Sequence, residues 1–387
     1  MTMAKKFPVF YPSIHTFEIH GTYYRLPIMV KLFERMKELI KEEKYYPANK
    51  KKKQNDKSGK NENAPKSYCY TRNGGGLRVE LGQRTEYGEW HIVLSGINLA
   101  RIAGNTSRLA LVDLSPEGFN HQIECFLMEL EQLGFLEYEY EIDWILYRVD
   151  VTQDFYVKCD PILPIKLVRY AGESKPHGKG KENHYTKHNE KRSARFEKEE
   201  YDFEIYDKHK ALLSDVGKGF YVPEEDVERS KNLVRYEIQL KRKYLLKVER
   251  QFFGFDAAGI PIRPRMQELP FLLVQIWKMA PGILYNRAEE LFDNDPWYSA
   301  DIALKKIEEI NLDDSTRELV EQYIKSVNGE RIAPTYSRYQ LSKIKKTLKL
   351  LRINSVIIPD RILNAREYAR LPYAPLCSKV QSIRGNL

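Results

Sequence analysis

Three short segments of this sequence alternate polar with apolar residues, and each carries acids and bases on its polar side. They are residues 148–155 (RVDVTQDF), 202–208 (DFEIYDK) and 235–241 (RYEIQLK). A period of two is typical of a β-strand that buries one face. Three such strands in one antiparallel sheet bury their aliphatic and aromatic side chains together and gather their charges on the other side. The pattern predicts a sheet whose polar face is an active-site floor.

An ordinary half-exposed antiparallel sheet produces the same alternation, because the period reports burial alone. For a single strand, a solvated face is the better interpretation. Here every one of the three strands places an acid beside a base, so we favour an active site over a solvated face. The predicted polar side chains are Arg148, Asp150, Thr152 and Asp154, then Asp202, Glu204, Tyr206 and Lys208, then Arg235, Glu237, Gln239 and Lys241.

The remaining strands and helices are segregated along the chain. Strands are expected over residues 16–20, in a hairpin over 77–96 and over 138–144, and helical spacing covers residues 27–44 and 115–134. Segregated elements favour an α+β fold with an antiparallel sheet over a doubly wound parallel one.

The length of 387 residues predicts two or three domains. We expect a sheet-based domain over residues 1–250, a connecting region over 251–300 and a helical module over 301–387. Within the first domain, residues 49–66 hold a single apolar residue, Ala64, and many lysines. Such a segment cannot bury a core, so it is expected to be a mobile loop.

The C-terminal module is expected to contain three short helices, over residues 301–310, 315–327 and 336–351. Short helices that end with a basic one are typical of helix-turn-helix or winged-helix-like DNA-binding domains. A plain helical bundle with a solvated lysine face is the alternative. The candidate DNA contacts on the third helix are Arg338, Lys343, Lys345, Lys346 and Lys349.

Composition narrows the class of protein. The net charge of +9 is compatible with nucleic-acid binding, although many basic proteins bind no nucleic acid. The four cysteines are far apart and form no C-x-x-C pair, which argues against a zinc site and a disulfide framework. No apolar run is long enough to cross a bilayer and no signal-peptide core follows the first residues, so we expect a cytoplasmic protein without a membrane partner.

Tyr185 lies in a basic stretch just before the second strand of the polar face. A tyrosine near clustered carboxylates suggests phosphoryl transfer. Because the ordinary pKa of tyrosine is near 10, a divalent cation is needed to polarise the phosphate. Carboxylates suit Mg²⁺ or Mn²⁺. The ligand candidates are Asp150, Asp154 and Glu237, and Arg148 and Arg235 are candidates for holding phosphate oxygens, with surface ion pairs as the alternative.

Four blocks in order resemble replication initiators of the filamentous-phage gene II/X type and the related plasmid rolling-circle initiators. They are SGINLARIAGN (95–105), RVDVTQD (148–154), a tyrosine followed by a basic stretch and IYDK (205–208), and RYEIQLKR (235–242). The resemblance covers roughly residues 15–250. The stretch SRYQLSKIKKTLKLLRI (337–353) is similar to the family's terminal helical module.

The resemblance implies an origin-specific endonuclease that nicks one strand, stays linked to the 5′ phosphate through tyrosine, and rejoins strands. By matching position, Tyr185 is that tyrosine, and Asp150, Asp154 and Glu237 are the metal-site acids. Asp207 and Lys208 belong to the YDK block as phosphate support. The segment after Tyr185 carries an acidic insertion, residues 197–204, so Tyr201 or Tyr206 is the alternative nucleophile. Without a His-hydrophobic-His pair, the carboxylate type of nickase is favoured.

Several partners follow from the same resemblance. They are origin DNA in single- and double-stranded form, a host helicase and a single-strand-binding protein in the bacterial cytoplasm, and a homodimer is compatible with it. The source replicon, phage or plasmid, stays open. The alternative function is a non-catalytic DNA-binding regulator that uses the basic C-terminal helices.

Tyr185→Phe removes the hydroxyl and keeps the ring. We expect this variant to lose nicking and the covalent protein–DNA adduct while it retains DNA binding, as measured by denaturing gels on labelled origin DNA. Tyr201→Phe and Tyr206→Phe are the matched variants. A phosphotyrosyl adduct formed by Tyr185→Phe would transfer the role to one of these two tyrosines.

Overall fold

The computed structural model describes residues 12–48, 68–83, 89–113, 115–157, 161–162, 164–165, 168, 193–259, 262–292, 298–328, 336–355 and 357. Tyr185 and the lysine-rich segment 49–66 lie outside these ranges. Within them, no helix combines the length and the apolar character needed to cross a lipid bilayer.

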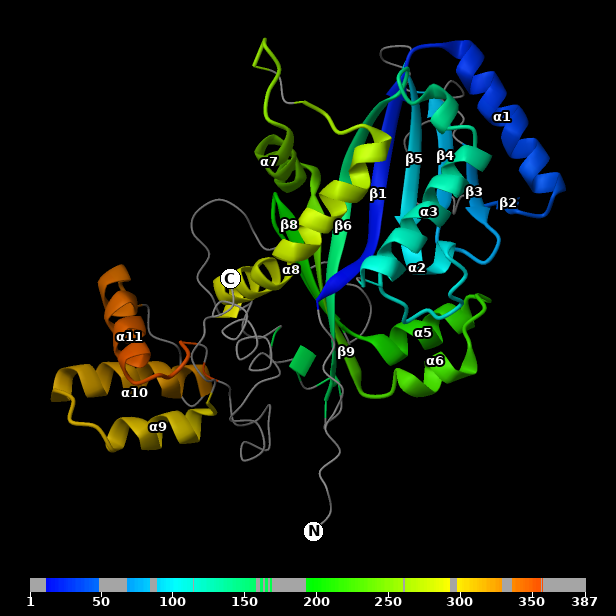
Figure 1. Ribbon diagram of the computed structural model, residues 1–387. Helices are drawn as coiled ribbons and strands as arrows, with labels where there is room; N and C mark the ends of the chain where they lie inside the picture. The colour runs from blue at the N-terminus through cyan, green and yellow to red at the C-terminus, as the bar shows by residue number, and fades with distance from the viewer. Residues whose placement is uncertain are drawn as a thin grey trace, which may run out of the picture.

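The described strands form one nine-stranded antiparallel sheet in the order β2-β3-β4-β5-β1-β6-β9-β8-β7 (Figure 1). This arrangement, with helices segregated from the strands along the chain, confirms the predicted α+β class. The strands are β1 (Ser13–Tyr23), β2 (Tyr45–Pro47), β3 (Tyr68–Arg72), β4 (Arg78–Gln83), β5 (Trp90–Ile97), β6 (Asp143–Tyr156), β7 (Ser193–Glu197), β8 (Tyr201–Asp207) and β9 (Leu233–Lys241).

The three alternating segments of the sequence are β6, β8 and β9, and they are neighbours in the sheet. Strand β9 lies between the other two and pairs antiparallel with both. Glu237 lies opposite Thr152 on β6 and opposite Glu204 on β8. Since side chains alternate between the two faces of a strand, this register places all the predicted polar side chains of these strands on one face.

Residues 138–144, expected as a separate strand, are mostly a turn, and this prediction is wrong. A short 3₁₀ helix, η1 (Leu136–Tyr138), is followed by a turn in which the backbone N–H groups of Glu141 and Ile142 both donate to the Tyr138 carbonyl at 3.1 Å. The period-two spacing here does not report a strand: Ile142 and Trp144 are buried, whereas Tyr140 is 80% exposed, and local hydrogen bonds satisfy the backbone. The strand β6 begins only at Asp143.

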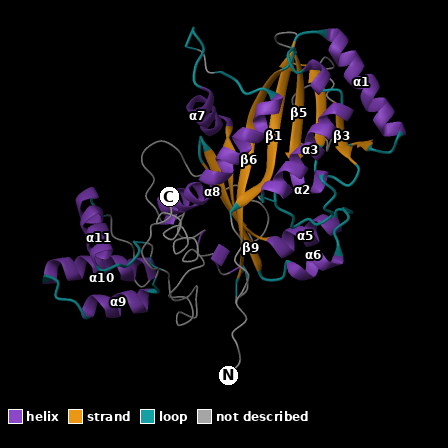
Figure 2. Cartoon of the chain, in the orientation of Figure 1, coloured by secondary structure: helices purple, strands orange, loops and turns teal. Residues whose placement is uncertain are grey.

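Helices cover the apolar face of the sheet, and Figure 2 shows α3 and α8 crossing in front of the strands. The ring of Phe126 in α3 contacts Phe17 of β1 edge-on, with 5.7 Å between ring centroids. The helices of this part of the chain are α1 (Leu26–Lys41), α2 (Leu99–Ile102), α3 (Pro116–Gln132), α5 (Lys208–Gly217), α6 (Glu224–Arg229), α7 (Arg242–Phe253) and α8 (Leu269–Phe292).

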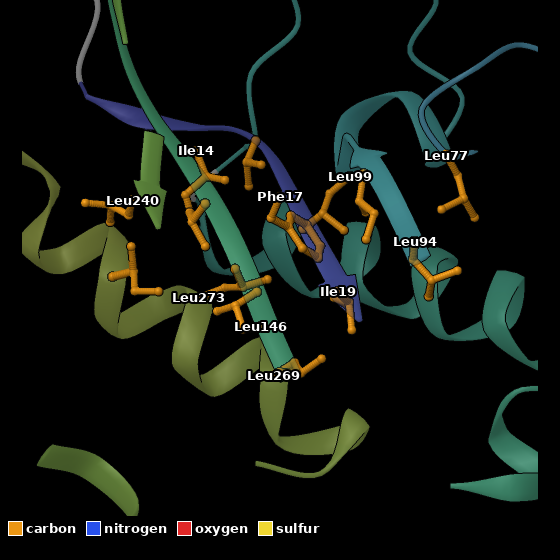
Figure 3. Close-up of a cluster of buried hydrophobic side chains, with 14 of the residues drawn as sticks. Ile14, Phe17, Ile19, Leu77, Leu94, Leu99, Leu146, Leu240, Leu269 and Leu273 are labelled. Carbon is orange, nitrogen blue, oxygen red and sulfur yellow. The ribbon is translucent and has the colours of Figure 1, made fainter. Parts of the chain in front are cut away.

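The core shows that α8 belongs to the sheet. Leu269 and Leu273 of this helix lie among Ile14, Leu146 and Leu240 of the strands, and all five are buried (Figure 3). The segment 270–279 is therefore a helix with its apolar side in the core. Residues 251–300 do more than connect two domains, because they supply part of the core that the sheet needs.

A second hydrophobic cluster is formed by α9 (Ala300–Glu308), α10 (Asp314–Asn328) and α11 (Arg338–Leu350). Its centre includes Ile307, Val320, Ile324, Ile344 and Leu348, which share no residue with the core of the sheet. Ser337 and Gln340 form a reciprocal capping box at the start of α11. The three helices predicted at the C-terminal end are present, with ends that differ by up to two residues.

Candidate active site

The side of the sheet opposite the core carries a set of charged and polar side chains, which we call the polar face. Its central residues are buried, so their charges must be paired or neutralised. Strand β1 adds to it, because Thr16 lies opposite Asp150. The polar face comprises His15, Thr16, Arg148, Asp150, Thr152, Asp154, Asp202, Glu204, Tyr206, Arg235, Glu237 and Gln239.

Asp154 and Arg235 form a bidentate ion pair across β6 and β9. Arg235 Nε donates to Oδ1 of Asp154 at 2.6 Å, and Nη2 donates to Oδ2 at 2.7 Å. The Arg235 side chain is 0% exposed. Burial alone would lower the pKa of Arg235, but the Asp154 carboxylate raises it above its usual range. Since both oxygens of Asp154 are engaged by a guanidinium that cannot leave for solvent, we assign this predicted ligand a structural role.

Asp150 has a more exposed partner. Thr16 Oγ1 donates to its carboxylate, and Arg148 Nε and Nη2 lie 3.0 and 3.1 Å from its two oxygens. Burial and the nearby charge of Glu237 raise the pKa of Asp150 to about 7, against the opposing effects of Arg148 and Thr16. The Arg148 side chain is 34% exposed, so it can turn away from Asp150 in a way that Arg235 cannot from Asp154.

Glu237 lies at the centre of the polar face. Its carboxylate accepts from Gln239 Nε2 at 3.1 Å and from the Tyr206 hydroxyl at 3.3 Å, and His15 Nδ1 is 3.5 Å away. Burial opposes ionisation, but His15, Gln239 and Arg235 hold the pKa of Glu237 below its usual range. Burial and then Arg235 lower the pKa of His15 to about 4, so a neutral imidazole faces Glu237 at pH 7.

Glu204 is an acid that sequence reasoning placed on this face but did not select. It lies opposite Glu237, and like charges in that position repel. Burial and Glu237 raise the pKa of Glu204 to about 7. By contrast, Asp202 is paired with Arg195 at 2.7 Å and with Lys241 at 2.5 Å. The polar face thus contains three acids that repel one another, and each comes from a different neighbouring strand: Asp150 from β6, Glu237 from β9 and Glu204 from β8.

His15 and Thr16 were missed by sequence reasoning for a physical reason. The register of β1 against β6 shifts between Ile14 and Thr16, and again between Glu18 and Ile19. These irregularities interrupt the strict alternation that marks β6, β8 and β9, so two residues that reach the acids carry no periodic signal.

Five buried polar atoms of the polar face have no hydrogen-bond partner among the described residues. Three of them, Nε of Arg148, Oδ1 of Asp150 and Oδ1 of Asp202, are in ion pairs. The other two are Oγ1 of Thr152, which lies opposite Glu237, and Nη1 of Arg235. Most buried polar atoms in proteins are hydrogen-bonded, so such exceptions mark places where a ligand oxygen can bind.

The fit of a metal ion to this donor set can be judged from the described residues. They contain no group of three His, Cys, Asp or Glu side chains arranged to hold a metal. The repelling pair Asp150 and Glu237 therefore offers two carboxylates at most. Mg²⁺ is usually held by one or two carboxylates together with waters and substrate phosphates, so the pair fits this mode and does not form an all-protein cage.

The two residues of the YDK block have different positions. Lys208 is buried at the start of α5 with Nζ 5.8 Å from the centre of the Tyr206 ring, and burial and then Arg235 lower its pKa to about 7. Asp207 instead lies on the apolar face of β8. Its carboxylate caps α5 by accepting a hydrogen bond from the Lys210 N–H at 3.1 Å. Lys208 thus belongs to the site, whereas Asp207 positions the helix that carries it.

The candidate nucleophiles are also separated by the structure. Tyr185 lies outside the described residues. Tyr201 faces the apolar side and is part of the core, which removes it as a nucleophile on the polar face. Tyr206 faces the acids, and burial and then Glu237 raise its pKa well above 10.

The basic face predicted for α11 is present. Arg338, Lys345, Lys346 and Lys349 are exposed, whereas Lys343 is half-buried and contributes to lowering the pKa of Asp313. On the opposite side, Ile344 and Leu348 are buried in the second cluster. Contact of this face with DNA stays a prediction.

Comparison with known proteins adds little to these observations. No protein-family model matches the chain, and no curated protein matches it. Among solved structures, the chain is similar to a rolling circle replication initiator protein from Geobacillus stearothermophilus, with 17% identity, a TM-score of 0.27, and coverage of 61% of this chain and 77% of that one. A TM-score of this size is too low to establish a shared fold, so we base no conclusion on it.

Asp154→Asn should destabilise the protein strongly, because it leaves a buried guanidinium without its counter-charge. The expected loss is about 3–5 kcal/mol in the free energy of unfolding, measured in urea. Glu228→Gln is the control, since it removes a carboxylate from an ion pair with Lys231 of the same 2.6 Å length at the surface. That change should stay within about 0.5 kcal/mol. Equal effects of the two changes would contradict the structural role of Asp154.

The raised pKa of Asp150 predicts a pH dependence of stability in the absence of divalent cations. Between about pH 4 and pH 7 the folded protein holds a proton at Asp150 that the unfolded chain has released, so stability falls as the pH rises and levels off above pH 7. We expect the difference in melting temperature between wild type and Asp150→Asn to change over this window and to be constant above it. A constant difference from pH 4 to pH 7 would contradict the raised pKa.

Proposed function

We propose that the protein is a metal-dependent DNA nickase and strand transferase that starts rolling-circle replication of a phage or plasmid. The observation that carries this proposal is the pair of buried, repelling carboxylates on adjacent strands, Asp150 and Glu237. A fold gains nothing in stability from such a pair. Perturbed acids that are buried together are typical of catalytic and metal-binding sites.

Asp150 and Glu237 are the residues that would hold Mg²⁺ or Mn²⁺, whose contribution is to polarise the scissile phosphate and to neutralise its charge. Arg148 would release Asp150 toward the ion, because its side chain is partly open to solvent. Arg235 is held in place by Asp154, and its unpartnered Nη1 and the Thr152 hydroxyl would donate to phosphate oxygens.

Lys208 is suited to proton transfer in this site. With a pKa of about 7, its amine exists in both protonation states at neutral pH, which is the range in which a general acid or base is most effective. We therefore assign proton exchange with the reacting oxygen to Nζ of Lys208.

Tyr185 is the proposed nucleophile, on the strength of its sequence position in the family pattern. Tyr206 is the second candidate, because its hydroxyl lies 3.3 Å from Glu237. Burial and then Glu237 raise the pKa of this tyrosine, and a cation held by Glu237 would offset the contribution of the Glu237 charge.

Origin recognition is assigned to α11, whose exposed Arg338, Lys345, Lys346 and Lys349 face away from the second cluster. Phosphate contacts position a protein on DNA, while a helix in the major groove can distinguish bases. A host helicase, a single-strand-binding protein and a second copy of the chain are the partners that this function would require or allow in the bacterial cytoplasm.

The test uses supercoiled DNA that carries the cognate origin. Asp150→Asn and Glu237→Gln should reduce nicking with Mg²⁺ at least a hundredfold, with partial recovery at high Mn²⁺, because each removes one charge from the ion site. Glu199→Gln is the matched control, since it removes a carboxylate that is exposed and paired with Lys243 in the β7–β8 turn. It should nick normally.

Full nicking activity in EDTA would contradict the role of the metal. Origin binding by the wild-type protein without any nick would instead favour the non-catalytic regulator.

A further inference from the structure

Two exposed aromatic side chains lie just beyond the C-terminal end of α5. Gly219, with a φ of 82°, ends this helix, and the following turn leaves Phe220 50% exposed and Tyr221 77% exposed. Exposed aromatic side chains that lie together are candidates for an interaction surface. Together with Arg108, from the loop after α2, they form what we call the aromatic–arginine patch.

The patch is held in position from two segments that are distant in the sequence. Buried Asp226 at α6 accepts from the backbone N–H of Arg108 at 2.6 Å and from the Ser107 hydroxyl at 2.7 Å. The Arg108 side chain then donates from Nε to the Tyr221 carbonyl at 3.2 Å, and its guanidinium carbon lies 5.9 Å from the centre of the Phe220 ring. The arginine and the aromatic turn are therefore fixed to each other before any ligand arrives.

The guanidinium of Arg108 has no carboxylate within ion-pair distance in the described part of the chain, although the backbone N–H of the same residue donates to Asp226. Nearby Arg101 in α2 offers no counter-charge, since it is itself a cation and donates from Nη2 to the Gly74 carbonyl. An anion beside Arg108 would supply the missing counter-charge.

We propose that the aromatic–arginine patch binds single-stranded DNA, with bases stacked on Tyr221 and Phe220 and a phosphate held by Arg108. Exposed aromatic rings beside unpaired cations are how proteins bind single strands, because every unpaired base has a face that can stack. In a duplex the base faces are already stacked on one another, so the rings would have nothing to bind. An apolar protein partner would use the rings but leave the Arg108 guanidinium without a counter-charge.

The position of the patch relative to the polar face supports a single strand as the ligand. Lys208, which belongs to the candidate active site, begins α5, and the patch follows the end of the same helix. A helix of ten residues spans roughly 15 Å. If the proposed nickase function holds, the patch binds one strand close to where it is opened.

The experiment measures binding of a fluorescein-labelled oligothymidylate to the full chain by anisotropy, with EDTA present so that no cleavage occurs. The double change Phe220→Ala and Tyr221→Ala should weaken binding at least tenfold. Tyr221→Leu, which keeps an apolar side chain but removes the ring, should also weaken it. Arg108→Gln should weaken binding and reduce the slope of log affinity against log salt by about one.

Tyr140→Ala is the matched control, because Tyr140 is 80% exposed and lies beneath Arg265 at 5.5 Å in a similar aromatic–arginine pair on another part of the surface. It should bind like the wild type. Unchanged affinity in the patch variants, or an equal loss in Tyr140→Ala or on a duplex of the same length, would overturn the proposal. Since binding is measured without metal or cleavage, a failure of the nickase proposal would appear only in the nicking assay.

Discussion

The buried ion pair between Asp154 and Arg235 is the interaction on which the polar face depends. A guanidinium that is 0% exposed is stable only when its charge is matched, and the two parallel hydrogen bonds from Arg235 match it. The pair also joins β6 to β9 at one register. Because side chains in a sheet are positioned residue by residue, that register places Thr152 opposite Glu237 and Asp150 opposite Gln239.

The two faces of the sheet constrain each other. A slip of one residue between β6 and β9 would move the acids into the core and the aliphatic residues out of it, so packing of α3 and α8 on the apolar side protects the arrangement of the acids on the other. Within that arrangement, Glu204 and Glu237 face each other as like charges. The packing of the large core offsets the cost of this repulsion.

Helix α5 runs from the polar face to the molecular surface. Asp207 caps it from the apolar side of β8, Lys208 lies buried at its start near the Tyr206 ring, and the turn after Gly217 presents the aromatic rings to solvent. The orientation of one capped helix therefore positions both a group suited to proton transfer and a surface suited to nucleic acid. The same chain adds a separate three-helix cluster whose basic helix faces outward.

The sequence alone determined which side chains share a face in β6, β8 and β9, the α+β class, and the three C-terminal helices, because these follow from local periods of two and 3.6 residues. Only the tertiary structure decided that Asp154 is bound by a buried arginine while Asp150 has an exposed partner, that Glu204 faces Glu237, and that the bulged strand β1 brings Thr16 to Asp150. It also decided that residues 138–142 form a turn and that α8 completes the core. Strand order, register and burial arise between segments far apart in the chain, so the role of each carboxylate depends on neighbours that no local pattern specifies.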